Sequence, residues 1–114
     1  MTQEEFEVLI GRAEPTENDL PVPSVSVVYF TATWCGPCRS IRTTELESEL
    51  PEVNWLKCDI DQNNYTPGYC NISNIPTFLV IKNKTILGKF SASNTETIVT
   101  NIRRLIESYE LNKK

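Results

Sequence analysis

The sequence predicts an α/β fold in which a central mixed β-sheet is flanked by helices on both faces. Three observations predict it. Strand-like apolar segments alternate with helical segments, the first strand-like segment is apolar on both of its faces, and the last two lie only a short turn apart. The 114 residues fit a single domain of the usual size, about 100–200 residues. We expect one domain over residues 1–114, with an acidic N-terminal helix, a connector to residue 24 and a core over residues 25–111.

The first half of the chain is expected to hold two helices and two strands. Residues 2–13 repeat apolar side chains at helical spacing, which predicts a short helix. Residues 25–31 are rich in β-branched and aromatic residues and are apolar on both parities, as in a strand covered on both faces. Residues 36–50 are expected to form the next helix, which Pro51 ends. Residues 53–60 are expected to form a second covered strand.

The second half is expected to add a short helix, a hairpin and a long helix. Residues 61–70 are polar and interrupted by Pro67-Gly68, which predicts a short or irregular helix. Residues 77–81 and 85–90 read as two strands of an antiparallel hairpin. Ser93 and Glu96 are spaced as a capping box that opens the last helix. The apolar stripe of that helix is interpreted as core contact; it consists of Ile98, Ile102, Leu105, Ile106 and Tyr109.

The charge pattern excludes some classes of partner. Eleven basic and 15 acidic residues give a net charge of −4. The imbalance is local, because residues 1–20 hold six acids and one base while the other 94 residues hold nine acids and ten bases. No basic stripe typical of a nucleic-acid binder is present, and no apolar run reaches the length of a membrane-spanning helix, about 20 residues. We therefore expect that neither nucleic acid nor a membrane is a partner. We also expect the protein to be a monomer.

The composition of the first residues indicates in which compartment the protein is expected. It is acidic, whereas mitochondrial presequences are basic and poor in acids. The apolar run Val8-Leu9-Ile10 is too short for the core of a signal peptide. We expect a cytoplasmic protein, with the mitochondrial matrix as the alternative if a presequence was removed.

Cys35 and Cys38 carry the strongest functional signal, because Cys-Gly-Pro-Cys lies directly between a predicted strand and a predicted helix. A helix start offers unpaired N–H groups and the positive end of the dipole, which stabilise a thiolate at Cys35. Gly36 lets the backbone approach closely, and Pro37 suits the first helical position. The predicted chemistry is thiol–disulfide exchange, in which an accessible Cys35 attacks a disulfide and a protected Cys38 resolves the mixed disulfide. Since the chain has no histidine, Ser-His and Cys-His catalytic pairs are excluded.

Two other interpretations of the cysteines stay open. A static Cys35–Cys38 disulfide would close too small a loop to stabilise much. A zinc site could use all four cysteines, but Cys58 and Cys70 are not a second C-x-x-C pair. We expect Cys58 to be an inert core thiol. Cys70 is expected to be structural, with an exposed thiol open to glutathionylation or an intermolecular disulfide as the alternative.

Residues 30–39 (Phe-Thr-Ala-Thr-Trp-Cys-Gly-Pro-Cys-Arg) resemble the active-site segment of thioredoxins. The resemblance continues through residues 57–63 and through Ile75-Pro76-Thr77. It implies the thioredoxin fold and a protein-disulfide reductase in cell redox homeostasis, with no bound cofactor. The implied source of reducing equivalents is an NADPH-dependent flavin enzyme, thioredoxin reductase. The implied clients are proteins with exposed disulfides, of the peroxiredoxin or ribonucleotide-reductase type.

The same resemblance implies how a substrate binds. Pro76 is expected to follow a cis peptide bond, and Ile75 to offer its backbone to an extended substrate segment. Trp34 is expected to form an apolar, partly exposed rim. Thr77 and Ser91 are expected beside this groove, and Ser91 stands where thioredoxins usually carry a glycine, so the groove is expected to be narrower or more polar.

Tyr29 is the main departure from the family pattern. Thioredoxins place a buried aspartate six residues before the first cysteine, where it is usually assigned to proton transfer with the resolving thiol; a phenol stays protonated at neutral pH. Lys57 matches the lysine that partners that aspartate. Either a buried Lys57 contacts the Tyr29 hydroxyl and aids deprotonation of Cys38, or it reaches solvent and takes no part. Thr43 replaces a proline that commonly kinks the active-site helix, so that helix is expected to run straighter.

Two rival functions follow. Tyr29 favours a redox-inert binding module of a larger assembly, kept for its substrate groove. The second rival is an oxidase or isomerase of a secretory compartment. The Gly-Pro pair between the cysteines and the lack of a signal-peptide pattern speak against that rival.

Overall fold

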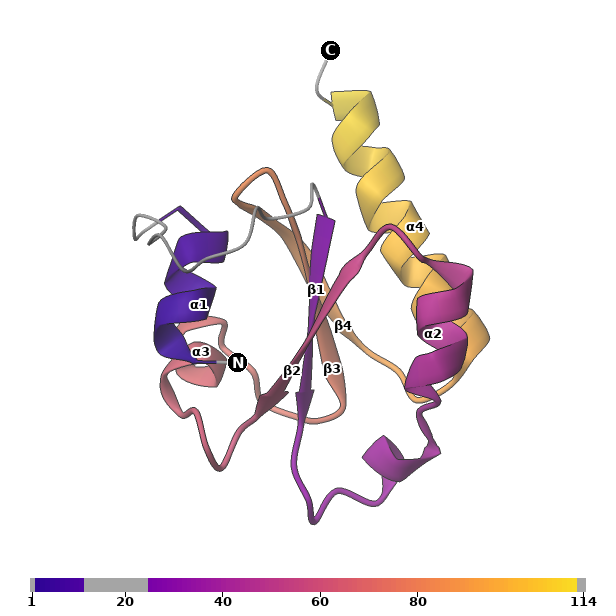
Figure 1. Cartoon of the computed structure of the whole chain (residues 1–114). Coiled ribbons are helices and arrows are strands. Elements are labelled where there is room, and N and C mark those ends of the chain that lie inside the picture. Colours follow the sequence, from indigo (N-terminus) through magenta and orange to yellow (C-terminus); the bar gives the residue numbers. More distant parts are fainter. Residues whose placement is uncertain (1, 12–24, 113–114) are drawn as a thin grey trace.

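Figure 1 shows the computed structural model, which describes residues 2–11 and 25–112. The elements in chain order are α1 (Gln3–Leu9), β1 (Val25–Thr31), the 3₁₀ turn η1 (Pro37–Ser40), α2 (Thr43–Glu49), β2 (Asn54–Asp59), α3 (Tyr65–Tyr69), β3 (Thr77–Lys82), β4 (Thr85–Ser91) and α4 (Thr95–Asn112). The predicted connector to residue 24, together with the end of the predicted first helix, lies outside the described residues.

The described strands form one sheet in the order β2-β1-β3-β4. β1 pairs parallel with β2 and antiparallel with β3, and β4 pairs antiparallel with β3. The predicted hairpin is the β3–β4 pair, and its turn holds Asn83 and Lys84 at φ values of 51° and 64°. Two successive residues at positive φ match the twist of a tight hairpin. The predicted fold class, a mixed sheet with helices on both faces, is confirmed.

Each face of the sheet carries its own apolar cluster. On one face, Val27 and Tyr29 of β1 pack with residues of α2 and α4. On the other, Val28 and Phe30 pack with Phe6 of α1. Figure 1 shows the same division, with α2 and α4 on one side of the sheet and α1 and α3 on the other. This is why β1 is apolar on both parities. Each fully buried valine or phenylalanine side chain stabilises the fold by about 1.5–3 kcal/mol.

The second predicted strand is found as β2 and contacts the apolar clusters on both faces, with Trp55 against one and Leu56 against the other. Among the described strands β2 is the outermost on its side and pairs with β1. Of its six residues only Cys58 is buried, and Lys57 is exposed. β2 is therefore covered on both faces, but less completely than β1.

The prediction of a single helix over residues 36–50 is wrong. The chain forms η1, passes through Ile41 in an extended conformation (φ −79°, ψ 127°) and then begins α2 at Thr43. The segment around the break contains Ile41, Thr43 and Thr44, and such β-branched residues are weak helix formers. Thr43 therefore opens a second helix, and the expectation that it lets one helix run straighter is wrong.

The ends of α1 and α4 also differ from prediction. α1 begins with a capping box between Thr2 and Glu5 and stops at Leu9, earlier than predicted. Gly11 follows with a φ of 78°, a conformation that suits glycine after a helix end. At α4 the cap is Asn94 and not the predicted Ser93, because the Asn94 side chain accepts a hydrogen bond from the Thr97 N–H at 3.2 Å. No helix of the described residues is long and apolar enough to cross a membrane.

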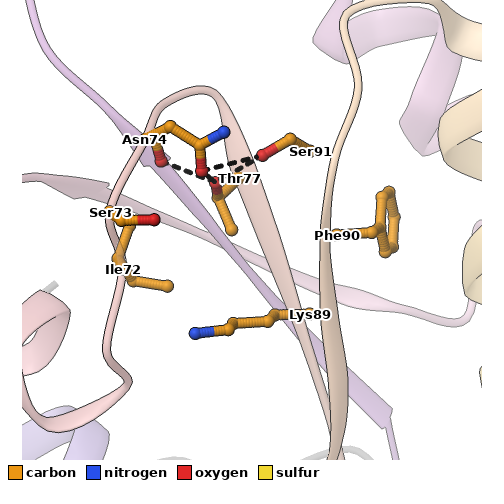
Figure 2. Close-up of a pocket in the computed structure, with 7 residues that line it drawn as sticks. All are labelled: Ile72, Ser73, Asn74, Thr77, Lys89, Phe90 and Ser91. Carbon is orange, nitrogen blue, oxygen red and sulfur yellow. Dashed lines mark hydrogen bonds between the residues drawn. The ribbon is translucent and has the colours of Figure 1, made fainter.

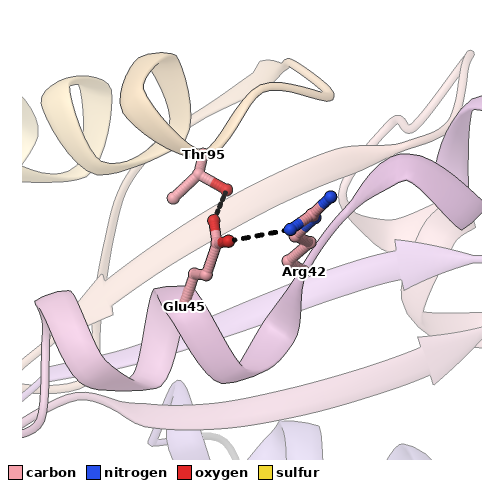
Figure 3. Close-up of polar contacts among 3 residues, drawn as sticks. All are labelled: Arg42, Glu45 and Thr95. Atoms are coloured by element: carbon pink, nitrogen blue, oxygen red, sulfur yellow. Dashed lines mark hydrogen bonds and ion pairs between the residues drawn. The ribbon is translucent and has the colours of Figure 1, made fainter.

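The starts of α2 and α4 are joined by a polar contact (Figure 3). The Thr95 hydroxyl donates to the Glu45 carboxylate at 3.0 Å, and the Arg42 guanidinium lies 3.3 Å from the same carboxylate. Such exposed contacts contribute little stability, about 0–1 kcal/mol each. They link the segment that directly follows η1 to the start of α4.

Candidate active site

Cys35 and Cys38 are joined by a disulfide bond just beyond the end of β1. The backbone N–H of Cys38 donates to the Cys35 Sγ at 3.2 Å. An N–H directed at a sulfur stabilises negative charge on it, which favours the thiolate of the reduced state. Cys35 is 4% exposed and Cys38 is 7% exposed, so the expectation of an accessible Cys35 is not met in this oxidised form. An attacking thiol has to reach the small exposed part of the pair.

Local backbone contacts hold the turn that carries the pair. The Cys35 N–H donates to the Ala32 carbonyl at 3.1 Å, and the Arg39 side chain donates to the Thr33 carbonyl at 3.2 Å. Pro37 opens η1, as the sequence predicts for a first helical position. The role expected for Gly36, a close backbone approach, is not found. Its φ is −60° and a Cβ there would meet nothing within 4 Å, so this glycine leaves open surface beside the disulfide.

Trp34 forms the exposed rim that the resemblance implies. Its side chain is 64% exposed, and its indole N–H donates to Asp61 Oδ2 at 2.9 Å. The Asp61 N–H in turn donates to the Asp59 carboxylate at 2.9 Å. Sequence reasoning missed Asp61; the one signal for it is its place in the segment over residues 57–63, which the resemblance covers.

A groove runs beside this rim. Trp34 and Ile75 line the same pocket of about 300 Å³, together with Ile60, Pro67 and residues 72–74. The peptide bond between Ile75 and Pro76 is cis, as the resemblance implies. The structure therefore brings the tryptophan before Cys35 and the residue before the cis-proline to one concave surface.

Thr77 and Ser91 lie opposite each other in the β3–β4 register, at the same end of the sheet. Their hydroxyl oxygens are 3.0 Å apart, and both hydroxyls bond to Asn74 (Figure 2). Ser91 and Thr77 line a neighbouring pocket and not the groove that contains Trp34, so the effect expected of Ser91 on the groove stays a prediction. Asn74 was not singled out from the sequence, because its partners lie on separate strands.

Tyr29 is tied to the resolving position. Its hydroxyl donates to the Cys38 carbonyl at 3.2 Å, and its ring stacks on Phe78 with 5.1 Å between centroids. Tyr29, Lys57 and Trp55 line one cavity of about 170 Å³. The hypothesis of a buried Lys57 is wrong, because this residue of β2 is exposed. The indole N–H of Trp55 is buried and has no hydrogen-bond partner among the described residues.

The other two cysteines are free. Cys58 is fully buried, which confirms its predicted place in the core, and desolvation raises the pKa of its thiol, as fits an inert thiol. Cys70 is partly buried at the end of α3, and desolvation raises its pKa to about 11 while Lys89 opposes that shift. A thiol protonated at neutral pH fits the structural role. Among the described residues no group of three or more Cys, Asp or Glu side chains is placed to hold a metal ion.

Three comparisons place this site among known proteins. The family model described as Thioredoxin matches residues 3–104. Mitochondrial thioredoxin-3 of Saccharomyces cerevisiae is 33% identical over 81 residues, a match spanning 69% of this chain and 64% of that relative. The crystal structure of its oxidised form has a TM-score of 0.74 and 28% identity, with 90% of each chain covered.

Two further solved structures have the same fold. The thioredoxin of Fasciola hepatica has a TM-score of 0.73 and 35% identity, covering 90% of this chain and 93% of that one. A chain from a study of the thiol resolving mechanism in yeast mitochondrial 1-Cys peroxiredoxin, via glutathione and thioredoxin systems, has a TM-score of 0.71 and 28% identity, covering 91% and 93%.

Proposed function

Because the chain belongs to the thioredoxin family, we propose that Cys35 is its attacking thiol and Cys38 its resolving thiol. The protein is a protein-disulfide reductase acting on client proteins that contain disulfides. The observation that carries the assignment of roles is the Cys38 N–H bonded to the Cys35 sulfur, since it stabilises the thiolate at Cys35 and not at Cys38.

The exchange proceeds in two steps. The Cys35 thiolate attacks one sulfur of the client disulfide, that bond breaks, and the second client sulfur leaves as a thiolate that takes up a proton. The Cys38 thiolate then attacks the Cys35 sulfur and releases the first client sulfur. Two electrons pass from the Cys35–Cys38 dithiol to the client, and the pair ends as the disulfide seen in the structure. The sulfur atoms carry the whole reaction, so no bound cofactor is needed.

Tyr29 acts as a positioning residue for Cys38. Its hydroxyl donates a hydrogen bond to the Cys38 carbonyl, and its ring stacks on Phe78. This fixes the backbone that carries the resolving sulfur against the core. The exposed side chain of Lys57 supports the interpretation in which this lysine takes no part in proton transfer.

The groove beside Trp34 receives an extended client segment. Ile75, which precedes the cis bond to Pro76, offers backbone groups to that segment. Thr77 and Ser91 lie beyond residues 72–74, where they line a neighbouring pocket. The Trp34 indole, held by Asp61, covers the segment from the other side.

Further proposals concern partners and place. We propose an NADPH-dependent flavin enzyme of the thioredoxin reductase type as the source of electrons, and clients of the peroxiredoxin or ribonucleotide-reductase type. The similarity to a chain studied with a 1-Cys peroxiredoxin supports the first kind of client.

We propose one domain over residues 1–114 that acts as a monomer in the cytoplasm. The mitochondrial matrix is the alternative, which the similarity to a mitochondrial thioredoxin supports.

Trapping tests the roles of the two cysteines. The Cys38→Ser variant is expected to stall as a mixed disulfide with clients, because no thiol remains to resolve it, and mass spectrometry identifies the partner cysteine. The Cys35→Ser variant is the matched control and should trap nothing. Trapping by Cys35→Ser in place of Cys38→Ser would reverse the roles.

An insulin-reduction assay with dithiothreitol separates the reductase from a redox-inert binding module. Tyr29, which replaces the family's buried aspartate, is the observation that keeps this second function in view. The reductase accelerates insulin precipitation above the rate with dithiothreitol alone. A rate equal to that of dithiothreitol alone would favour the binding module.

A further inference from the structure

A second pocket borders the groove on the other side of residues 72–74. It measures about 160 Å³, and Ile72, Ser73 and Asn74 line both it and the groove that contains Trp34. Figure 2 shows it between these residues and β4, with Lys89 at one end and Ser91 at the other. A client segment lying in the groove therefore passes the entrance of this second pocket.

Lys89 places a fixed positive charge in this second pocket. Its Nζ donates to the Cys70 carbonyl at 2.9 Å and to the Asn71 carbonyl at 2.6 Å. An ammonium has three N–H donors, so one remains beyond these two bonds. No carboxylate among the described residues forms an ion pair with Lys89. The charge is thus held in place by neutral groups and is not neutralised.

The opposite end of the second pocket is held by three side chains. The Thr77 hydroxyl donates to the Asn74 carbonyl at 2.6 Å, and the Ser91 hydroxyl donates to Asn74 Oδ1 at 3.2 Å. These bonds tie the segment that carries Ser73 to β3 and β4. The Ser73 hydroxyl, exposed and lining the second pocket, supplies one more donor. The pocket is thus held open before a ligand arrives, which lowers the entropic cost of binding.

We propose that the second pocket receives the carboxylate of an aspartate or glutamate that lies close to the disulfide of a client protein. A carboxylate only accepts hydrogen bonds, and here it meets a fixed ammonium and a hydroxyl. This inference rests on the proposed function, because the client must first dock with its disulfide at Cys35. The proposed preference for an acidic side chain is opposite to what the net charge of −4 favours, since that charge by itself attracts basic clients. A preference set by the second pocket is therefore confined to one or two client positions.

Peptide substrates test the proposal directly. Each is a seven-residue peptide whose central cysteine is disulfide-bonded to the neutral leaving group 2-thiopyridone. A single glutamate occupies one of the other six positions in turn, and each peptide is matched with its glutamine counterpart. We expect the glutamate peptide to have a higher kcat/KM at one or two positions, by about three- to tenfold at low salt. That advantage should shrink at high salt. Equal values for glutamate and glutamine at every position would overturn the proposal.

Variants assign the preference to Lys89. Lys89→Met keeps much of the apolar stem and removes the charge, so the glutamate-to-glutamine ratio should fall to about one while Lys89→Arg keeps part of it. Lys84→Met is the matched control, because it changes the net charge equally from an exposed turn position. The rate on the glutamine peptide reports any general damage from losing the bonds to Cys70 and Asn71. An unchanged ratio in Lys89→Met would refute the assignment.

The same assay distinguishes a failure of the proposed reductase function from a failure of the proposed pocket. If no peptide is reduced faster than by dithiothreitol alone, the reductase function has failed. If every peptide is reduced and the glutamate advantage is absent, only the acidic-side-chain pocket has failed.

Discussion

The four cysteines form two contrasting pairs. Cys35 and Cys58 are both buried, at 4% and 0% exposed, so burial does not distinguish a reactive sulfur from an inert one. The difference lies in the neighbours. Cys35 receives the N–H of Cys38 and has a second sulfur three residues away, whereas desolvation dominates at Cys58 and Cys70 and raises the pKa of each thiol. Reactivity is thus set by what the local backbone directs at a sulfur atom.

The largest expected effect is loss of activity when the reactive pair is broken. Cys35→Ser should reduce insulin no faster than dithiothreitol alone, because the thiol that remains at the turn, Cys38, is not the sulfur that receives the activating N–H. Cys58→Ala is the matched control and should keep its activity while losing about 1 kcal/mol of unfolding free energy from the core. If Cys35→Ser kept residual activity that disappeared when Cys58 was also replaced, Cys58 would be reactive and the contrast between Cys35 and Cys58 would be wrong.

Next in size is a pH effect at the other pair. The Cys70 pKa is raised from 9.0 to about 11, so the folded state favours the neutral thiol. This contribution to stability is fully present below pH 9 and is lost as pH rises through about 11. The free energy of unfolding should therefore fall more steeply between pH 9 and 11 in the parent protein than in Cys70→Ala. Chemical denaturation across that range measures it, and parallel pH curves would contradict the raised pKa.

A smaller effect is expected at Tyr29. Tyr29→Phe removes the hydrogen bond to the Cys38 carbonyl but keeps the ring stack, so stability should fall by about 0.5–1.5 kcal/mol. In single-turnover kinetics the release of client from Cys35 should slow, while formation of the mixed disulfide keeps its rate. Tyr65→Phe is the control, because no hydrogen bond to its hydroxyl is found among the described residues. Slowing of the first step instead of the second would show that Tyr29 does not position Cys38.

The smallest expected effect is at Lys57. Because its side chain is exposed, Lys57→Met should leave the rate of disulfide reduction unchanged from pH 6 to pH 9. Lys84→Met gives the same change in net charge at a distant turn. A rate that drops in Lys57→Met alone, and more at lower pH, would restore the proton-transfer role.

Much of the fold follows from local pattern. β1 is apolar on both parities because its odd and even residues enter different clusters, and three polar residues between two apolar runs are enough to indicate the β3–β4 hairpin. The Cys35–Cys38 turn is also local, so the sequence predicts its chemistry. The cis bond before Pro76 came from the family resemblance, since an X–Pro bond has only about a 5–6% prior of being cis.

What the sequence could not predict depends on contacts between distant segments. The exposure of Lys57 depends on where β2 lies among the described strands, and the sequence does not give the strand order. The partners of Trp34 and Ser91 are 27 and 17 residues away. The break after η1 is local, yet apolar periodicity alone did not reveal it; β-branched residues at Ile41 and Thr43 were the available signal.

The most direct measurement is the rate at which each cysteine of the fully reduced protein is alkylated at pH 7. Iodoacetamide labelling followed by peptide mass spectrometry gives a separate rate for every site. Labelling at position 35 should outpace that of an unstructured peptide thiol, with Cys58 and Cys70 far slower than the peptide. If Cys35 is labelled no faster than the peptide, its surroundings do not activate the sulfur, and the contrast between the two pairs is wrong.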